Sequence, residues 1–128
     1  MSKLGCICGH TIRDQTDFIP YKASFIRDQD IESHSSYIEV IDSFIKALKT
    51  GKRVQWLKNY FSADYPIDLS DANIISDIVS QYDLNFQGTL YQCENCGRVK
   101  IQIQNTNHFA SFTPEDDDGL DIFKQAQE

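Results

Sequence analysis

Apolar residues recur at helical spacing in the middle of the chain. In the first stretch they stand three and four residues apart, which places them on one face of a helix. These residues are Tyr37, Ile38, Ile41, Phe44, Ile45 and Leu48. Ser36 and Glu39 match a capping box at its start, and Gly51 is a typical stop. A shorter helix with Val54, Leu57, Tyr60 and Phe61 is expected to follow and to run until residues 64–66.

A third helix has the clearest start signal. Ser70 stands at the N-cap, Asp71 lies in the first turn, and Leu69 can pack against Ile74 one turn later. One apolar face follows, made of Ile74, Ile75, Ile78, Val79 and Tyr82. This pattern predicts a helix that begins directly after Ser70.

The hydrophobic period changes to two near the end of the chain. Val99, Ile101 and Ile103 alternate with Lys100, Gln102 and Gln104. The alternation predicts a strand whose apolar face is buried and whose polar face is wet. Residues 89–92 and 109–112 are expected to form further strands. Residues 18–26 are expected to form an extended edge segment around Pro20.

The order of these segments predicts an α+β fold with about three helices and a C-terminal β-hairpin. The chain has 128 residues, enough for one domain with a modest core. No repeat or low-complexity linker divides it. We therefore expect a globular domain over residues 1–113, followed by an acidic tail over residues 114–128.

Four cysteines fall into two pairs near opposite ends of the chain. Cys6 and Cys8 belong to a Cys-x-Cys-Gly motif, and Cys93 and Cys96 to a Cys-x-x-Cys-Gly motif within the expected hairpin. Both sulfurs of such a turn can reach one ion, and the glycine can adopt the positive φ that the turn needs. Four thiolates complete a tetrahedral shell and leave no position for water or substrate. We predict a structural zinc ion bound by all four cysteines.

The cysteine pattern has other interpretations. Disulfides are disfavoured in the reducing cytosol, and a bridge between Cys6 and Cys8 would be strained. The motif of Cys93 and Cys96 also occurs in thiol oxidoreductases, but there it opens a helix in a βαβ unit. An iron–sulfur centre is a further alternative. His10, two residues after Cys8, is a candidate substitute ligand or a support for the site.

Charge is distributed unevenly along the chain. The net charge is −7, and residues 114–128 alone contain six acids and one lysine. The rest is nearly neutral but includes a basic stretch with Lys46, Lys49, Lys52, Arg53 and Lys58. The acidic total argues against a nucleic-acid binder that depends on phosphate neutralisation.

No apolar run approaches the ~20 residues of a membrane span. The N-terminus lacks signal-peptide features, so we expect a cytoplasmic protein.

The sequence contains no recognisable catalytic pattern. No serine lies in a Gly-x-Ser-x-Gly motif, and no glycine-rich phosphate loop is present. His34 and His108 have no cysteine or carboxylate at a metal or catalytic spacing. Trp56 is expected in the core beside Tyr60. We therefore predict that the protein is not an enzyme and has no small-molecule substrate.

The assembled motifs resemble those of small bacterial proteins that carry Cys-x-Cys-Gly near the N-terminus and Cys-x-x-Cys-Gly-Arg near the C-terminus. Further similar stretches surround Phe18, Tyr65 and Pro114, so the resemblance spans nearly the whole chain. Some of these proteins resemble immunity proteins of polymorphic toxin systems. The resemblance implies a protein that binds and neutralises one cognate toxin domain in the cytoplasm.

Acidic residues are candidates for the contact with such a toxin. Toxins that act on nucleic acids or nucleotides often present a cationic cleft, which an acidic inhibitor can occupy. The candidate contact residues follow Pro114 and are Glu115, Asp116, Asp117 and Asp118. A solvated tail that only aids solubility is the simpler interpretation of these residues. The alternative function is a zinc-ribbon module that binds nucleic acid or a transcription or RNA-handling partner, with the basic stretch as its contact face.

Overall fold

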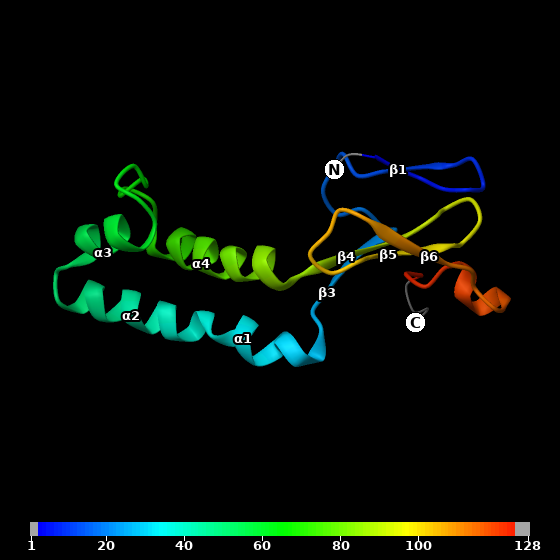
Figure 1. Ribbon diagram of the computed structural model, residues 1–128. Coiled ribbons are helices and arrows are strands. Elements are labelled where there is room, and N and C mark those ends of the chain that lie inside the picture. Colours follow the sequence, from blue (N-terminus) through cyan, green and yellow to red (C-terminus); the bar gives the residue numbers. More distant parts are fainter. Residues whose placement is uncertain (1–2, 125–128) are drawn as a thin grey trace. The chain divides into compact units, whose positions relative to one another are not determined.

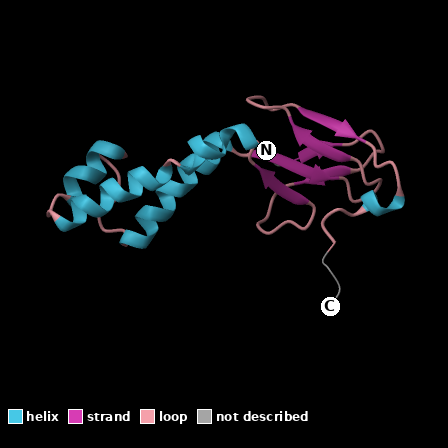
Figure 2. Ribbon diagram, turned by 90° about the horizontal axis from the view of Figure 1, so that it is seen from below, coloured by secondary structure: helices cyan, strands magenta, loops and turns pink. Residues whose placement is uncertain are grey.

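The computed structural model describes residues 3–124 and divides the chain into two compact units. The sheet unit contains residues 3–25 and 88–124, and the helical unit contains Ile26–Gln87. In Figure 1 the sheet unit is blue at its start and yellow to red at its end, whereas the helical unit runs from cyan to green. Figure 2 separates the helices from the strands by colour.

Two antiparallel sheets form the sheet unit. The smaller one pairs β1 (Lys3–Gly5) with β2 (Thr11–Arg13). The larger one has the order β3-β4-β5-β6. Its strands are β3 (Lys22–Phe25), β4 (Gly88–Gln92), β5 (Val99–Gln102) and β6 (Phe109–Phe112). A short 3-10 helix, η2 (Asp117–Leu120), follows the last strand. The predicted C-terminal hairpin is confirmed as β4 and β5.

The helical unit is an insertion between two paired strands. Phe25 at the end of β3 lies opposite Gly88 at the start of β4, so the chain leaves and re-enters the sheet at one point. A Cβ at residue 88 would lie 2.4 Å from the Phe25 ring, which explains the glycine. The inserted elements are η1 (Asp28–Asp30), α1 (Ile31–Ser35), α2 (Tyr37–Lys49), α3 (Arg53–Tyr60) and α4 (Asp71–Phe86). The α+β class is confirmed.

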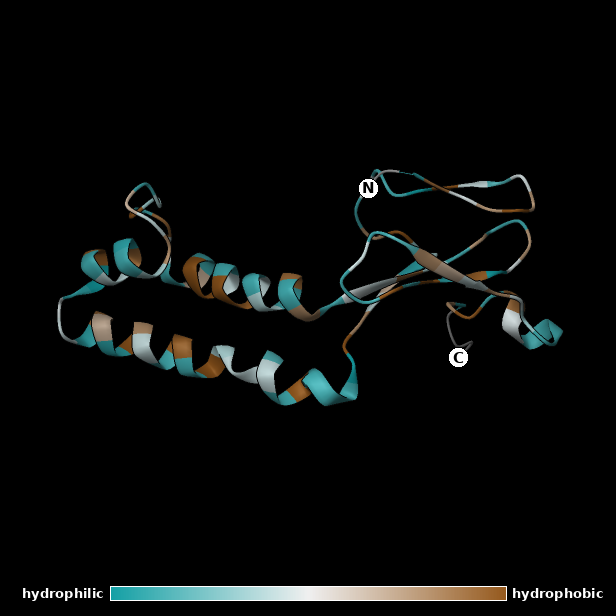
Figure 3. Cartoon of the chain, viewed as in Figure 1, coloured by the Kyte–Doolittle hydropathy of each residue, from teal (hydrophilic) through white to brown (hydrophobic). Residues whose placement is uncertain are grey.

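The core of the helical unit consists of aliphatic and aromatic side chains. Phe44, Leu57, Ile74 and Ile78 are each 0% exposed and come from three different helices. Around them lie partly buried aromatic rings, among them Trp56 stacked on Tyr60. Hydrophobic bands alternate with hydrophilic ones along α2 and α4 (Figure 3). Each buried aliphatic or phenyl side chain contributes about 1.5–3 kcal/mol, so this core is the main stabilising feature of the unit.

The two predicted helix starts have different outcomes. Ser70 caps α4 as predicted, because its hydroxyl accepts a hydrogen bond from the Asn73 amide at 3.1 Å. The predicted capping box at Ser36 is wrong. The short helix α1 directly precedes α2, so Ser36 has helical backbone angles and its hydroxyl donates to the Ser33 carbonyl at 2.6 Å. A helix that continues another helix has few unpaired amide groups to cap.

The prediction that the polar face of β5 is exposed to solvent is also wrong. Lys100 is only 4% exposed, whereas Ile103, expected in the core, is 49% exposed. Lys100 lies opposite Tyr91, whose ring packs with Ile12 of β2. The small β1–β2 sheet therefore covers the face that the alternation marks as polar. The Lys100 ammonium donates to the Ser111 hydroxyl at 2.7 Å, which offsets part of the cost of its burial.

Candidate metal centre

Two tight turns present the four cysteines of the sheet unit. In the first turn, the Cys6 amide donates to the His10 carbonyl and the Gly9 amide donates to the Cys6 carbonyl, both at 2.9 Å. In the second turn, between β4 and β5, the Cys93 amide donates to Arg98 at 2.8 Å and the Gly97 amide to Cys93 at 2.9 Å. The two glycines have φ of +98° and +80°, as the motifs predict.

The structure brings all four predicted ligands together. Their sulfur atoms lie within 4.8 Å of one another, although the two pairs are far apart in sequence. The Cys6–Cys96 and Cys8–Cys93 sulfur separations are both 3.6 Å, far beyond a disulfide bond of about 2.05 Å. Bonds of about 2.3 Å to a tetrahedral zinc ion place the sulfurs about 3.8 Å apart. The spacing therefore fits a four-coordinate metal ion.

Hydrogen-bond donors surround the sulfurs. The Asn95 side-chain amide donates to the Cys8 sulfur at 3.4 Å and so joins the two turns. The Arg98 guanidinium donates to the Cys96 sulfur at 3.2 Å. Four thiolates around a divalent ion carry two net negative charges, which these donors partly offset. Such outer contacts orient the ligands and tune a metal site.

The environments of the thiols differ. Hydrogen bonds from the Asn95 side chain and the His10 backbone lower the pKa of Cys8 to about 6. Burial raises the pKa of Cys93 to about 11. Burial also opposes ionisation of Cys96, but hydrogen bonds from the Arg98 backbone and side chain lower its pKa overall. Metal ligation requires thiolates, so the raised pKa of Cys93 opposes metal binding at low pH.

The histidines lie outside the four-sulfur cluster. His10 is near it, with Nε2 3.6 Å from the Glu94 carboxylate. His34 lies in the helical unit, where its Nε2 is 2.7 Å from a carboxylate oxygen of Asp83. This pair joins α1 to α4 across 49 residues, and sequence spacing did not reveal it. His108 uses its backbone carbonyl to accept a hydrogen bond from Ile103 at 2.8 Å.

A buried glutamine connects the second cysteine turn to the acidic segment. Gln92 is 4% exposed, and its Nε2 donates to the carbonyls of Gly97 at 2.9 Å and Gly119 at 2.7 Å. Its Oε1 accepts from the Ile122 amide at 2.9 Å. Sequence reasoning missed this role, because a lone glutamine in a strand carries no signal for partners 27 and 30 residues away.

The predicted contact acids belong to this anchored segment. Glu115, Asp116, Asp117 and Asp118 are all exposed. The Asp116 carboxylate accepts from the Asp118 amide at 3.1 Å and thereby caps η2. Leu120 packs over Gly97, where an added Cβ would lie 2.9 Å from the leucine side chain. The acids are thus attached to the end of the sheet unit that carries the cysteines.

Comparison with known proteins assigns the chain to a family. It belongs to the family described as "Domain of unknown function (DUF8617)", whose profile matches residues 2–116. The match includes all four cysteines and two of the four contact acids. No curated protein and no solved structure gives a significant match. Among residues 3–124, no helix is long and apolar enough to cross a membrane.

The four-sulfur cluster can hold one metal ion. A thiolate-only set favours zinc or iron and is poorly suited to magnesium or calcium. Once four sulfurs bind a tetrahedral ion, no coordination position is left for a substrate or a reactive water. An ion bound to all four sulfurs would crosslink the two cysteine turns.

Proposed function

We propose that the protein is a non-catalytic binding protein whose sheet unit is stabilised by one structural zinc ion. The observation that supports this most directly is the closed cluster of Cys6, Cys8, Cys93 and Cys96. Bound zinc supplies a crosslink and no reaction centre. The cysteines themselves anchor the β1–β2 sheet to the β4–β5 turn, where Cys93 is 1% exposed within the core of the unit.

The binding role that we propose is neutralisation of a cognate toxin domain in the cytoplasm, as in immunity proteins. Two observations support a protein partner. The motifs resemble those of such proteins, and the exposed acids from Glu115 to Asp118 lie on a segment that Gln92 holds in place. A pre-ordered acidic surface loses less entropy on binding than a free tail and can steer a cationic partner.

Two measurements test this function. Elemental analysis and native mass spectrometry of the purified protein should find one zinc per chain. Co-expression with a toxin domain encoded beside the gene should yield a stable complex and restore growth. A zinc-free protein that remains folded would contradict the structural site. Failure to bind or to protect against any neighbouring toxin would contradict the immunity role.

The same complex tests the acidic contact. Replacing Glu115, Asp116, Asp117 and Asp118 together by their amides should slow association and flatten its dependence on ionic strength. Zinc content and folding should stay unchanged. Equal association rates at every salt concentration would place recognition elsewhere on the protein.

A further inference from the structure

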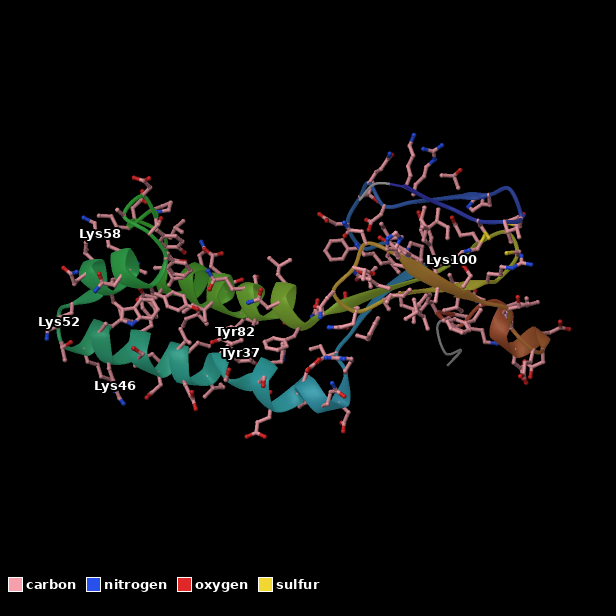
Figure 4. All side chains as sticks on the ribbon, viewed as in Figure 1. Tyr37, Lys46, Lys52, Lys58, Tyr82 and Lys100 are labelled. Carbon is pink, nitrogen blue, oxygen red and sulfur yellow. The ribbon has the colours of Figure 1, made fainter. Side chains whose placement is uncertain are left out.

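A cationic end of the helical unit stands out from an otherwise acidic chain. Residues 43–63 contain five basic residues and no acid, whereas the protein has a net charge of −7. This stretch covers the second half of α2, all of α3 and the connection between them. Lys46, Lys52 and Lys58 lie around this end of the unit (Figure 4).

Not all of these bases have the same role. Arg53 is structural, because it pairs with Asp71 at 2.9 Å and donates to the carbonyls of Ile67 and Leu69. Lys46 pairs with Asp42 at 3.0 Å, but both side chains are more than half exposed, so this ion pair is weak. The remaining lysines are Lys49, Lys52 and Lys58. All three are exposed, and none is in an ion pair among residues 3–124.

An apolar hollow lies beside two of the basic residues, Lys46 and Lys52. It has a volume of about 300 Å³ and a mostly apolar lining that includes Ala47 and Trp56, with Lys46 and Lys52 among its walls. We call it the basic hollow. The Trp56 indole is held in place, since its Nε1 donates to the Ser43 hydroxyl at 2.9 Å and its ring stacks on Tyr60. The hollow is therefore formed before any partner binds.

We propose that the basic hollow binds an acidic segment of a protein partner through one apolar anchor side chain. Lysines around an apolar pocket complement carboxylates that flank a leucine or phenylalanine. A rigid tryptophan in such a pocket is a common source of binding energy. This inference rests on the proposed binding role and adds a second surface, opposite in charge to Glu115–Asp118 and located in the other unit.

A nucleic acid fits these observations less well. Tyr60 is stacked on the Trp56 indole, and the centroid of the Phe44 ring lies 5.0 Å from that of the indole. Because these two rings already pack against the indole, it is poorly placed to stack on a base. The helical unit as a whole contains ten acids and six bases, which opposes long contact with a phosphate backbone. An acidic peptide needs only the local cations and the hollow.

The sole tryptophan of the chain gives a direct test, because Trp56 lines the hollow. The full-length protein is titrated with a synthetic peptide of Asp and Glu residues that has two leucines at its centre. We expect a change in tryptophan emission that saturates and weakens at high salt. The same peptide with alanines for leucines should bind more weakly, and a peptide with lysines for acids should not bind.

Matched variants locate the interaction. Lys46→Gln with Lys52→Gln should weaken peptide binding about 3- to 10-fold. Gln55→Glu, a nearly isosteric change in the wall of the hollow, should also weaken it. The control is Lys3→Gln with Lys124→Gln, which removes two exposed lysines from the sheet unit and should leave binding unchanged.

Several results would overturn the inference. These are no emission change with the acidic peptide, equal weakening by the control variant, or tighter binding of single-stranded oligothymidylate than of the peptide. The test is independent of zinc and of the cognate toxin. A negative result with zinc-loaded protein that still protects against a toxin would reject the basic hollow and leave the proposed function intact.

Discussion

The two units of the molecule are stabilised in different ways. The helical unit surrounds four fully buried apolar side chains with a ring of aromatic residues. Among the described residues of the sheet unit, the buried apolar cluster contains just Ile12, Tyr91 and Cys93, and Gln92 and Lys100 are buried as well. A core this small and this polar contributes little hydrophobic free energy. We therefore predict that the sheet unit needs the proposed metal crosslink for its stability, whereas the helical unit does not.

Removal of the metal should have the largest effect and should act on one unit only. Structural zinc in small domains contributes about 10–16 kcal/mol. Chelation, or Cys93→Ser, should therefore abolish the amide-exchange protection of β4 and β5. The far-ultraviolet circular dichroism of the helices should largely remain, because the helical core contains no cysteine. Residue-resolved hydrogen exchange measures both effects. If the amides of β4 and β5 stayed protected from exchange after complete metal removal, the sheet unit would not depend on the metal.

A truncation in the helical core should have the converse effect. Leu57 is 0% exposed, so Leu57→Ala should cost about 2–5 kcal/mol, as other large-to-small core changes do. Leu84→Ala is the matched control, because Leu84 is 84% exposed and its loss should cost less than about 0.5 kcal/mol. Urea unfolding gives the stabilities. Zinc content should be unchanged in both variants, and loss of zinc from Leu57→Ala would show that the units depend on each other.

A smaller effect is expected at Gln92, which links the second cysteine turn to the acidic segment. Gln92→Leu keeps much of the volume but removes three hydrogen bonds, including the donor to the buried Gly97 carbonyl, at a cost of about 1–3 kcal/mol. Exchange of the Ile122 amide should accelerate, and zinc should stay bound. The exposed Gln15 provides the control variant Gln15→Leu. An unchanged Ile122 exchange rate would mean that other contacts hold the segment.

The smallest effect is a pH dependence within the helical unit. Burial, together with the hydrogen bond to Asp77, raises the pKa of Tyr65 to about 12. A raised pKa stabilises the fold below the unfolded tyrosine pKa of about 10, and this contribution is lost as the pH rises toward 12. At pH 7 the free energy of unfolding of the wild type should exceed that of Tyr65→Phe by about 1 kcal/mol. The urea unfolding midpoints of the two proteins should converge between about pH 10 and 12. A difference between the midpoints that stays constant with pH would contradict this linkage.

Most of the candidate site could be predicted from the sequence. The cysteine motifs, the glycines after them and the hairpin around Cys93 depend on interactions between residues a few positions apart. The same holds for the Ser70 cap. Ser36 shows where such reasoning fails, since its capping pattern is valid only if no helix precedes it.

The sequence by itself determined the local features of this protein: the α+β order of segments, the α4 start at Ser70 and the two turns that present four thiolates. Only the tertiary structure decided which face of β5 is buried, because Ile12 from a distant strand covers Tyr91 beside Lys100. The tertiary structure also paired His34 with Asp83 and Gln92 with Ile122. Such contacts depend on where separate segments meet in space, and a local pattern of apolar and polar residues carries no information about that distance.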